Sequence, residues 1–101
     1  MSKNSIFMNN WLFESRADLV RVIRRILHST PLKTRITGTA DHQFLLDLFV
    51  HHPNHAGKVM GRTVSHFEPH HNKGGSTCFH SVFLEGGSAH FSYKKCVDAV
   101  V

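Results

Sequence analysis

Residues 76–96 read STCFHSVFLEGGSAHFSYKKC, and this segment is the strongest indication of the fold. Two runs rich in aromatic and apolar residues flank the sequence Glu85-Gly86-Gly87. Such runs on either side of a glycine turn predict a β-hairpin, in which two antiparallel strands are joined by a short loop. We expect the two strands at Thr77–Glu85 and Ser88–Tyr93.

A two-residue loop at Gly86-Gly87 would fix which residues face each other across this hairpin. The pairs would then be Glu85 with Ser88, Phe83 with His90, Ser81 with Ser92, and Phe79 with Lys94. Because side chains alternate between the faces of a sheet, one face would carry Val82, Leu84, Ala89, Phe91 and Tyr93. We interpret that face as part of the core. The opposite face would carry Phe79, Phe83, His90, Ser92 and Lys94.

The N-terminal third predicts a short hairpin followed by a helix. Residues 5–15 alternate around Asn9-Asn10, and asparagine tolerates the positive φ of a tight turn. Ser15 has the position of a helix N-cap, with an acidic residue three positions later. Apolar residues then recur at positions 19, 22, 23, 26 and 27, which is typical of an amphipathic helix. We expect this helix over about Arg16–Ser29, ending before Pro31.

A second helix is expected to start at Thr39, assigned as its N-cap, and to end before Pro53. Its buried stripe would consist of Phe44, Leu45, Leu48 and Phe49. The remaining segments are a connector at 54–61, a strand at 62–68 and a closing helix at 94–101. The order ββ-αα-βββ-α predicts an α+β fold: a single domain with two helices packed on an antiparallel sheet.

Length and charge narrow the possible functions. One domain is expected over residues 1–101, with a core at about 5–98. The net charge is +5 before ten histidines are counted, and this favours an anionic partner. The alternative is a soluble basic domain that binds no polyanion. No apolar run approaches the roughly 20 residues of a membrane-spanning helix. Two cysteines without an oxidising context favour reduced thiols and a cytoplasmic location.

The candidate nucleic-acid contacts fall into two groups. On the first helix, Arg21, Arg24, Arg25 and His28 lie roughly opposite the apolar stripe, and Lys33 and Arg35 follow in the next loop. The second group lies in the C-terminal strands and just after them, where aromatic rings could stack on bases and lysines could bind phosphates. We therefore expect phosphate contacts from Arg21, Arg24, Arg25, Arg62, Lys94 and Lys95, and stacking from Phe79, Phe83 and Tyr93. Alternatively, Phe79 and Phe83 belong to a second core layer.

Metal binding and catalysis are less well supported. His66, His70, His71, Cys78 and His80 are suitable zinc donors, but the sequence has no Cys-x2-Cys pair, so we expect no metal or other cofactor. The run from His51 to His55 superficially suggests a nuclease, the third alternative. Only Glu68 supplies a carboxylate between Asp47 and Glu85, so we expect no catalytic site. Cys96 is either a reactive thiol beside two lysines or, as its spacing favours, a core residue.

Several strings point to one family. Phe91-Ser92-Tyr93-Lys94-Lys95-Cys96 is the most specific, and Cys78-Phe79, His52-Pro53 and the helix at 16–27 support it in the same order. Over about Ile6–Val97 the chain resembles the "defective chloroplasts and leaves" (DeCL-type) domain. That domain occurs in plant plastid rRNA-processing proteins, at the C-terminus of the largest subunits of plant RNA polymerases Four and Five, and in small bacterial and phage proteins.

The resemblance implies an RNA- or transcription-linked binding module, and no catalytic residues carry over. Members carry Arg where Phe83 stands and Asp where His90 stands, so the expected register implies that an ion pair is replaced here. We therefore expect a non-enzymatic nucleic-acid-binding accessory domain, with RNA favoured, in RNA processing or transcription. The alternative is a protein-interaction module, such as a phage or bacterial adaptor or inhibitor of a polymerase or other nucleoprotein complex.

Overall fold

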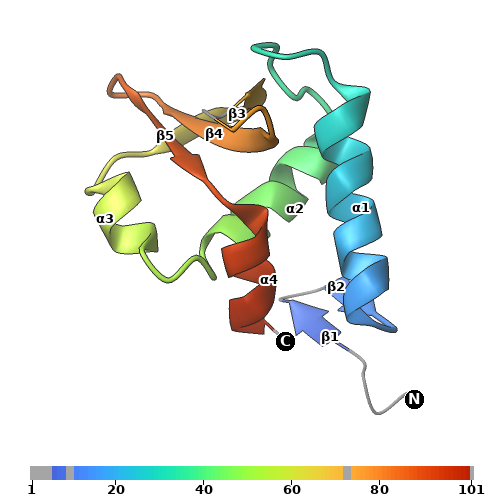
Figure 1. Ribbon diagram of the computed structural model, residues 1–101. Helices are drawn as coiled ribbons and strands as arrows, with labels where there is room; N and C mark the ends of the chain where they lie inside the picture. Colours follow the sequence, from blue (N-terminus) through green and yellow to red (C-terminus); the bar gives the residue numbers. More distant parts are fainter. Residues whose placement is uncertain (1–5, 9–10, 72–73, 101) are drawn as a thin grey trace.

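The computed structural model describes residues 6–8, 11–71 and 74–100 (Figure 1). Near the start of the chain, strands β1 (Ile6–Met8) and β2 (Trp11–Phe13) pair antiparallel, with Phe7 opposite Leu12. The two strands of the expected N-terminal hairpin are therefore confirmed. The predicted turn at Asn9-Asn10 lies outside the described residues.

Helix α1 (Arg16–Ser29) has the expected bounds. The Ser15 hydroxyl oxygen accepts a hydrogen bond from the Asp18 backbone N–H at 3.2 Å, which satisfies one of the free donors at the helix start. Its buried face consists of Leu19, Ile23, Ile26 and Leu27. Local signals thus determine both the position and the orientation of this helix.

Helix α2 (Thr39–Phe49) buries the four predicted residues Phe44, Leu45, Leu48 and Phe49. The assignment of Thr39 as N-cap was wrong, because Gly38 occupies that position and makes no side-chain capping bond. The expected connector contains an additional short helix, α3 (His55–Val59), which ends at Met60 in the left-handed conformation with φ 52°. A glycine inside a five-residue helix gives little helical signal, which explains the omission.

The C-terminal strands form a second antiparallel sheet in the order β3 (Val64–His71), β4 (Thr77–Phe83), β5 (Ser88–Phe91). Helix α4 (Tyr93–Val100) closes the described chain. Figure 1 shows this sheet at one end of the molecule and the β1–β2 hairpin with α4 at the other. Helix α1 contacts β4 and α4, and α2 contacts β3 and α4. The α+β class is confirmed, with the strands divided between two sheets.

The register of the β4–β5 hairpin differs from the prediction. Phe79 lies opposite Phe91 and His80 opposite His90, while Phe83 pairs with Val64 of β3 instead of His90. The Phe83 N–H donates to the Gly87 carbonyl and the Gly86 N–H donates to the Phe83 carbonyl, each at 3.1 Å. These bonds enclose a three-residue loop, in which Gly86 has the φ of 109° that glycine tolerates.

With the longer loop, Phe79 and Phe83 of β4 lie on the same face of the sheet as Phe91 of β5, whereas the prediction put them on the opposite face. Phe79 and Phe83 are buried together with Phe91, whereas Leu84 is 69% exposed and Val82 is only half-buried. The burial predicted for Phe91 is confirmed, and that predicted for Leu84 is wrong. The observed register buries all three phenylalanine rings, and this extra apolar burial favours it over the two-residue loop.

Phe91 lies at the centre of the aromatic core. Its ring stacks between Phe49, with ring centroids 4.5 Å apart, and Phe79, at 5.6 Å. Phe67 meets it edge-on at 5.9 Å. All four rings are at most 1% exposed, so strands β3, β4 and β5 and helix α2 are joined through this one side chain.

Candidate nucleic-acid interface

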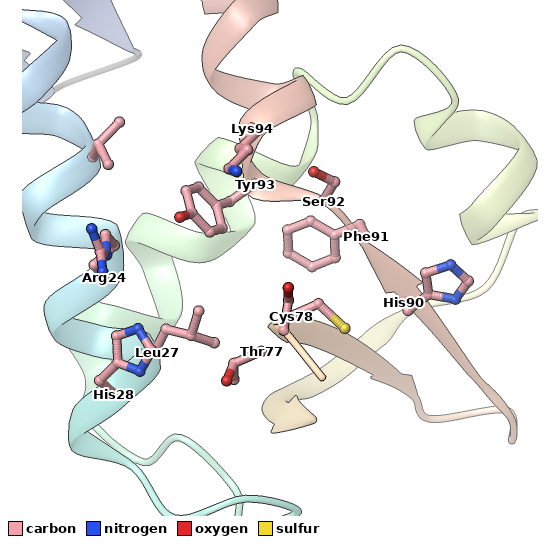
Figure 2. Close-up of a pocket in the computed structure, with 12 residues that line it drawn as sticks. Arg24, Leu27, His28, Thr77, Cys78, His90, Phe91, Ser92, Tyr93 and Lys94 are labelled. Carbon is pink, nitrogen blue, oxygen red and sulfur yellow. The ribbon is translucent and has the colours of Figure 1, made fainter. Parts of the chain in front are cut away.

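A groove of about 610 Å³ runs between α1 and the edge formed by β4, β5 and α4. From α1 it is lined by Val20, Arg24, Leu27 and His28; the opposite wall includes Thr77, Cys78, Phe91, Ser92, Tyr93 and Lys94. Figure 2 shows Arg24 and His28 projecting from α1, with Tyr93 and Lys94 on the other side. The groove thus lies between the basic side of α1 and residues Phe91 to Lys94, which begin the sequence string Phe91–Cys96 described above.

The local structure explains why these side chains converge. Arg24 and His28 are four residues apart, so they lie one above the other on the same side of α1. On the opposite wall, β5 ends at Phe91 and α4 begins at Tyr93, which turns the chain at Ser92. Phe91 is held in the core, and this positions Tyr93 and Lys94 next to the groove.

The groove is electropositive. Arg24 and Lys94 are exposed, and within the described part of the chain neither forms an ion pair. No aspartate or glutamate among the described residues lines the groove. Two permanent cations in a concave surface attract anionic groups such as phosphate.

The other arginines predicted on α1 are engaged with carboxylates. Arg21 forms an ion pair with Asp18 at 2.7 Å, and Arg25 lies 3.7 Å from Asp41 of α2. Both pairs are partly exposed, so they contribute little to stability. They do, however, neutralise part of the positive field, and of the three predicted arginines only Arg24 lines the groove.

Arg62 has a role within the fold. Its guanidinium carbon lies 4.1 Å from the centre of the Phe83 ring, and its N–H groups donate to the carbonyls of Lys58, Val59 and Gly86. It therefore ties α3 to the β4–β5 loop. Lys95 is exposed but lies outside the groove, beside a separate depression near Pro53. Neither residue joins the cations at the groove.

Phe79 and Phe83 are 0% and 3% exposed, so they cannot stack on a base. The alternative expectation, that they belong to the core, is confirmed. Tyr93, the third residue predicted to stack on a base, is half-buried and lines the groove. Thr77, at the start of β4, is a groove residue that the sequence did not single out; no local signal brings it next to α1.

The exchanged register also creates a histidine-rich outer sheet face that the sequence did not predict. His66 and His70 of β3 donate to the two oxygens of Glu68 at 3.0 and 2.9 Å. The rings of His70 and His80 stack with centroids 3.9 Å apart, and His90 of β5 lies 6.0 Å from His80. His66 and His70 are four residues apart in β3, and this even spacing was a visible signal for a shared face.

This face predicts that folding stability depends on pH. Burial, with the nearby His70 and His90, lowers the pKa of His80, against the attraction of Glu68. Burial also lowers the pKa of His52 and His55. The unfolded chain, in which histidine titrates near pH ~6.5, then binds more protons than the folded protein at slightly acid pH. The free energy of unfolding should therefore decrease as the pH falls from about 7.5 through the folded pKa of His80.

Urea denaturation across this pH range measures the effect. His80→Gln removes one titrating group, so its unfolding free energy should decline less steeply with pH than that of the wild type. An unchanged slope in the variant would contradict the assignment. The comparison of slopes does not depend on any constant loss of stability that the substitution causes.

Other reactive features do not form a site. No group of three or more His, Cys, Asp or Glu side chains in residues 6–8, 11–71 and 74–100 is arranged to hold a metal ion. Cys96 is fully buried, and burial raises the pKa of its thiol to about 12, which makes it a core residue and not a nucleophile. Over the same described ranges, no helix is long and apolar enough to cross a membrane.

Residues 24–97 match the family described as "Protein of unknown function (DUF3223)". The chain belongs to this family. The match includes Arg24, Tyr93 and Lys94, so the family region spans both walls of the groove.

A solution NMR structure of an uncharacterized protein from Rhodospirillum rubrum has the same fold. The TM-score is 0.80 and the sequence identity 29%, over 95% of this chain and 91% of that chain. No curated protein matches the sequence.

Proposed function

We propose that this protein is a small non-enzymatic nucleic-acid-binding domain, with RNA as its favoured partner, acting as an accessory in RNA processing or transcription. The observation that carries the proposal is the groove in which Arg24, His28 and Lys94 meet without a lining carboxylate among the described residues. Side chains from two distant parts of the sequence form it. Such a concentration of positive charge in a hollow suits a phosphate better than an uncharged partner.

The choice of RNA depends on the resemblance to the DeCL-type domain. The most specific string of that resemblance includes Ser92, Tyr93 and Lys94, all three of which line the groove. Residues that carry the resemblance to the DeCL-type domain are therefore also the residues to which we assign nucleic-acid binding.

A titration across salt concentrations tests this proposal. Labelled single- and double-stranded RNA and DNA are bound to the protein, and fluorescence anisotropy gives the dissociation constants. Neutralising about two or three phosphates of a single strand gives a slope of log affinity against log salt of about −0.7 per phosphate. A rise from about 50 to 200 mM salt should then weaken RNA binding by about tenfold.

The contrary result is an absence of salt-sensitive binding to all four nucleic acids at micromolar protein. It would favour the second candidate, a protein-interaction module. One observation supports that candidate: Phe7 and Leu12 face each other across β1 and β2 and are 60% and 55% exposed. Exposed apolar pairs of this kind are found at protein interfaces.

A further inference from the structure

We infer that the groove accepts one unpaired nucleotide, with its phosphate between Arg24 and Lys94 and its base against the Tyr93 ring. The inference rests on the proposed function and specifies its ligand: a flexible single strand or an unpaired position, and not a regular duplex.

The shape of the groove is the first argument. Its volume of about 610 Å³ lies within the range of pockets that hold small organic ligands, so it has room for a base and a sugar phosphate. In a duplex the bases are stacked and paired, so their faces are covered and only the backbone and the base edges in the grooves are available. A duplex would therefore reach the exposed cations at the rim and leave the hollow behind them unfilled.

The composition of the walls is the second argument. Val20 lines the groove from α1 together with the largely buried Leu27, and Tyr93 supplies an aromatic ring from the start of α4. A pocket made only for phosphate would not need this apolar surface, whereas a base has a broad π-face that stacks on aromatic rings. Thr77 and Ser92 add hydroxyl groups that can bond to the base edge or the ribose.

Tyr93 is well placed for stacking. It is half-buried and packs against the core beside Phe91, so its ring is held before a ligand arrives. A ring with few accessible rotamers loses little entropy on binding, and this improves affinity. Three aromatic residues were predicted to stack on bases. Phe79 and Phe83 are buried in the core, and Tyr93 lines the groove.

The test compares three RNAs of related sequence: a single strand, a blunt duplex, and the duplex with one unpaired nucleotide. The single strand should bind about tenfold more tightly than the blunt duplex at equal salt, and the unpaired nucleotide should restore much of that difference. Tyr93→Phe should retain the preference. Tyr93→Leu should lose about tenfold in single-strand affinity and leave duplex binding unchanged.

A fluorescent base keeps the test decisive if Tyr93→Leu does not fold. The wild-type protein should quench 2-aminopurine at the unpaired position, because stacking on a ring quenches its emission. Equal affinity for single strand and duplex, or full emission from the bound base, would overturn the inference and leave the proposed function standing. Failure of all three RNAs to bind would overturn both.

Discussion

Replacing Phe91 with alanine should lower the free energy of unfolding by about 3–5 kcal/mol, as truncation of a buried phenylalanine typically does. The Phe91 ring is 0% exposed and contacts Phe49, Phe67 and Phe79, so its removal leaves a cavity bounded by three rigid rings. A domain of this size has a total stability of only about 5–15 kcal/mol. Much of the variant should therefore unfold at moderate temperature.

Urea denaturation of matched variants measures this loss. Phe91→Leu keeps most of the apolar volume and should lose clearly less stability than the alanine variant. Phe7→Ala removes the same atoms from a ring that is 60% exposed, so it should change the unfolding free energy by less than about 1 kcal/mol. Similar losses for Phe91→Ala and Phe7→Ala would show that Phe91 is not at the centre of the core.

Elements defined by local interactions could be predicted from the sequence. Helix α1 has its capping serine, its apolar spacing and its terminating proline within one short stretch, and its observed bounds agree with the prediction. The buried face of α2 follows from spacing alone. In both helices the information lies in residues that are near one another along the chain.

The hairpin register depends on a competition that local rules do not resolve. Glu85-Gly86-Gly87 is compatible with a two-residue loop or with a three-residue loop carrying a glycine in the left-handed region. The second alternative is favoured because it buries Phe79 and Phe83 on the same face of the sheet as Phe91. The Glu85 carboxylate also accepts bonds from the backbone N–H and hydroxyl of Thr63, at 2.8 and 3.0 Å. These contacts depend on the tertiary structure.

The candidate site was likewise predictable only in part, because some of its features are local in the sequence and others depend on the tertiary structure. Arg24 and Lys94 were identified by charge, but the sequence could not separate them from Arg21, Arg25, Arg62 and Lys95. Their separation depends on Asp18, Asp41 and Phe83, which engage three of the other cations, and on the direction in which α4 begins. The groove forms only when α1 packs against β4 and α4 in the folded chain.

Arg24 and Lys94 are the residues between which we expect a phosphate to bind. The double variant Arg24→Glu/Lys94→Glu places two carboxylates where the phosphate should bind. Its control, Arg35→Glu/Lys95→Glu, has the same change in net charge and replaces an exposed arginine and lysine outside the groove. All four positions are exposed, so both variants should fold.

The most direct measurement is the affinity of both double variants and the wild type for one single-stranded RNA at the same salt concentration. We expect the groove variant to lose about a hundredfold, or roughly tenfold for each reversed contact, and the control to lose less than about fivefold. The control measures the contribution of net charge alone. Equal losses in the two variants would contradict the account, because binding would then depend on overall charge and not on the groove.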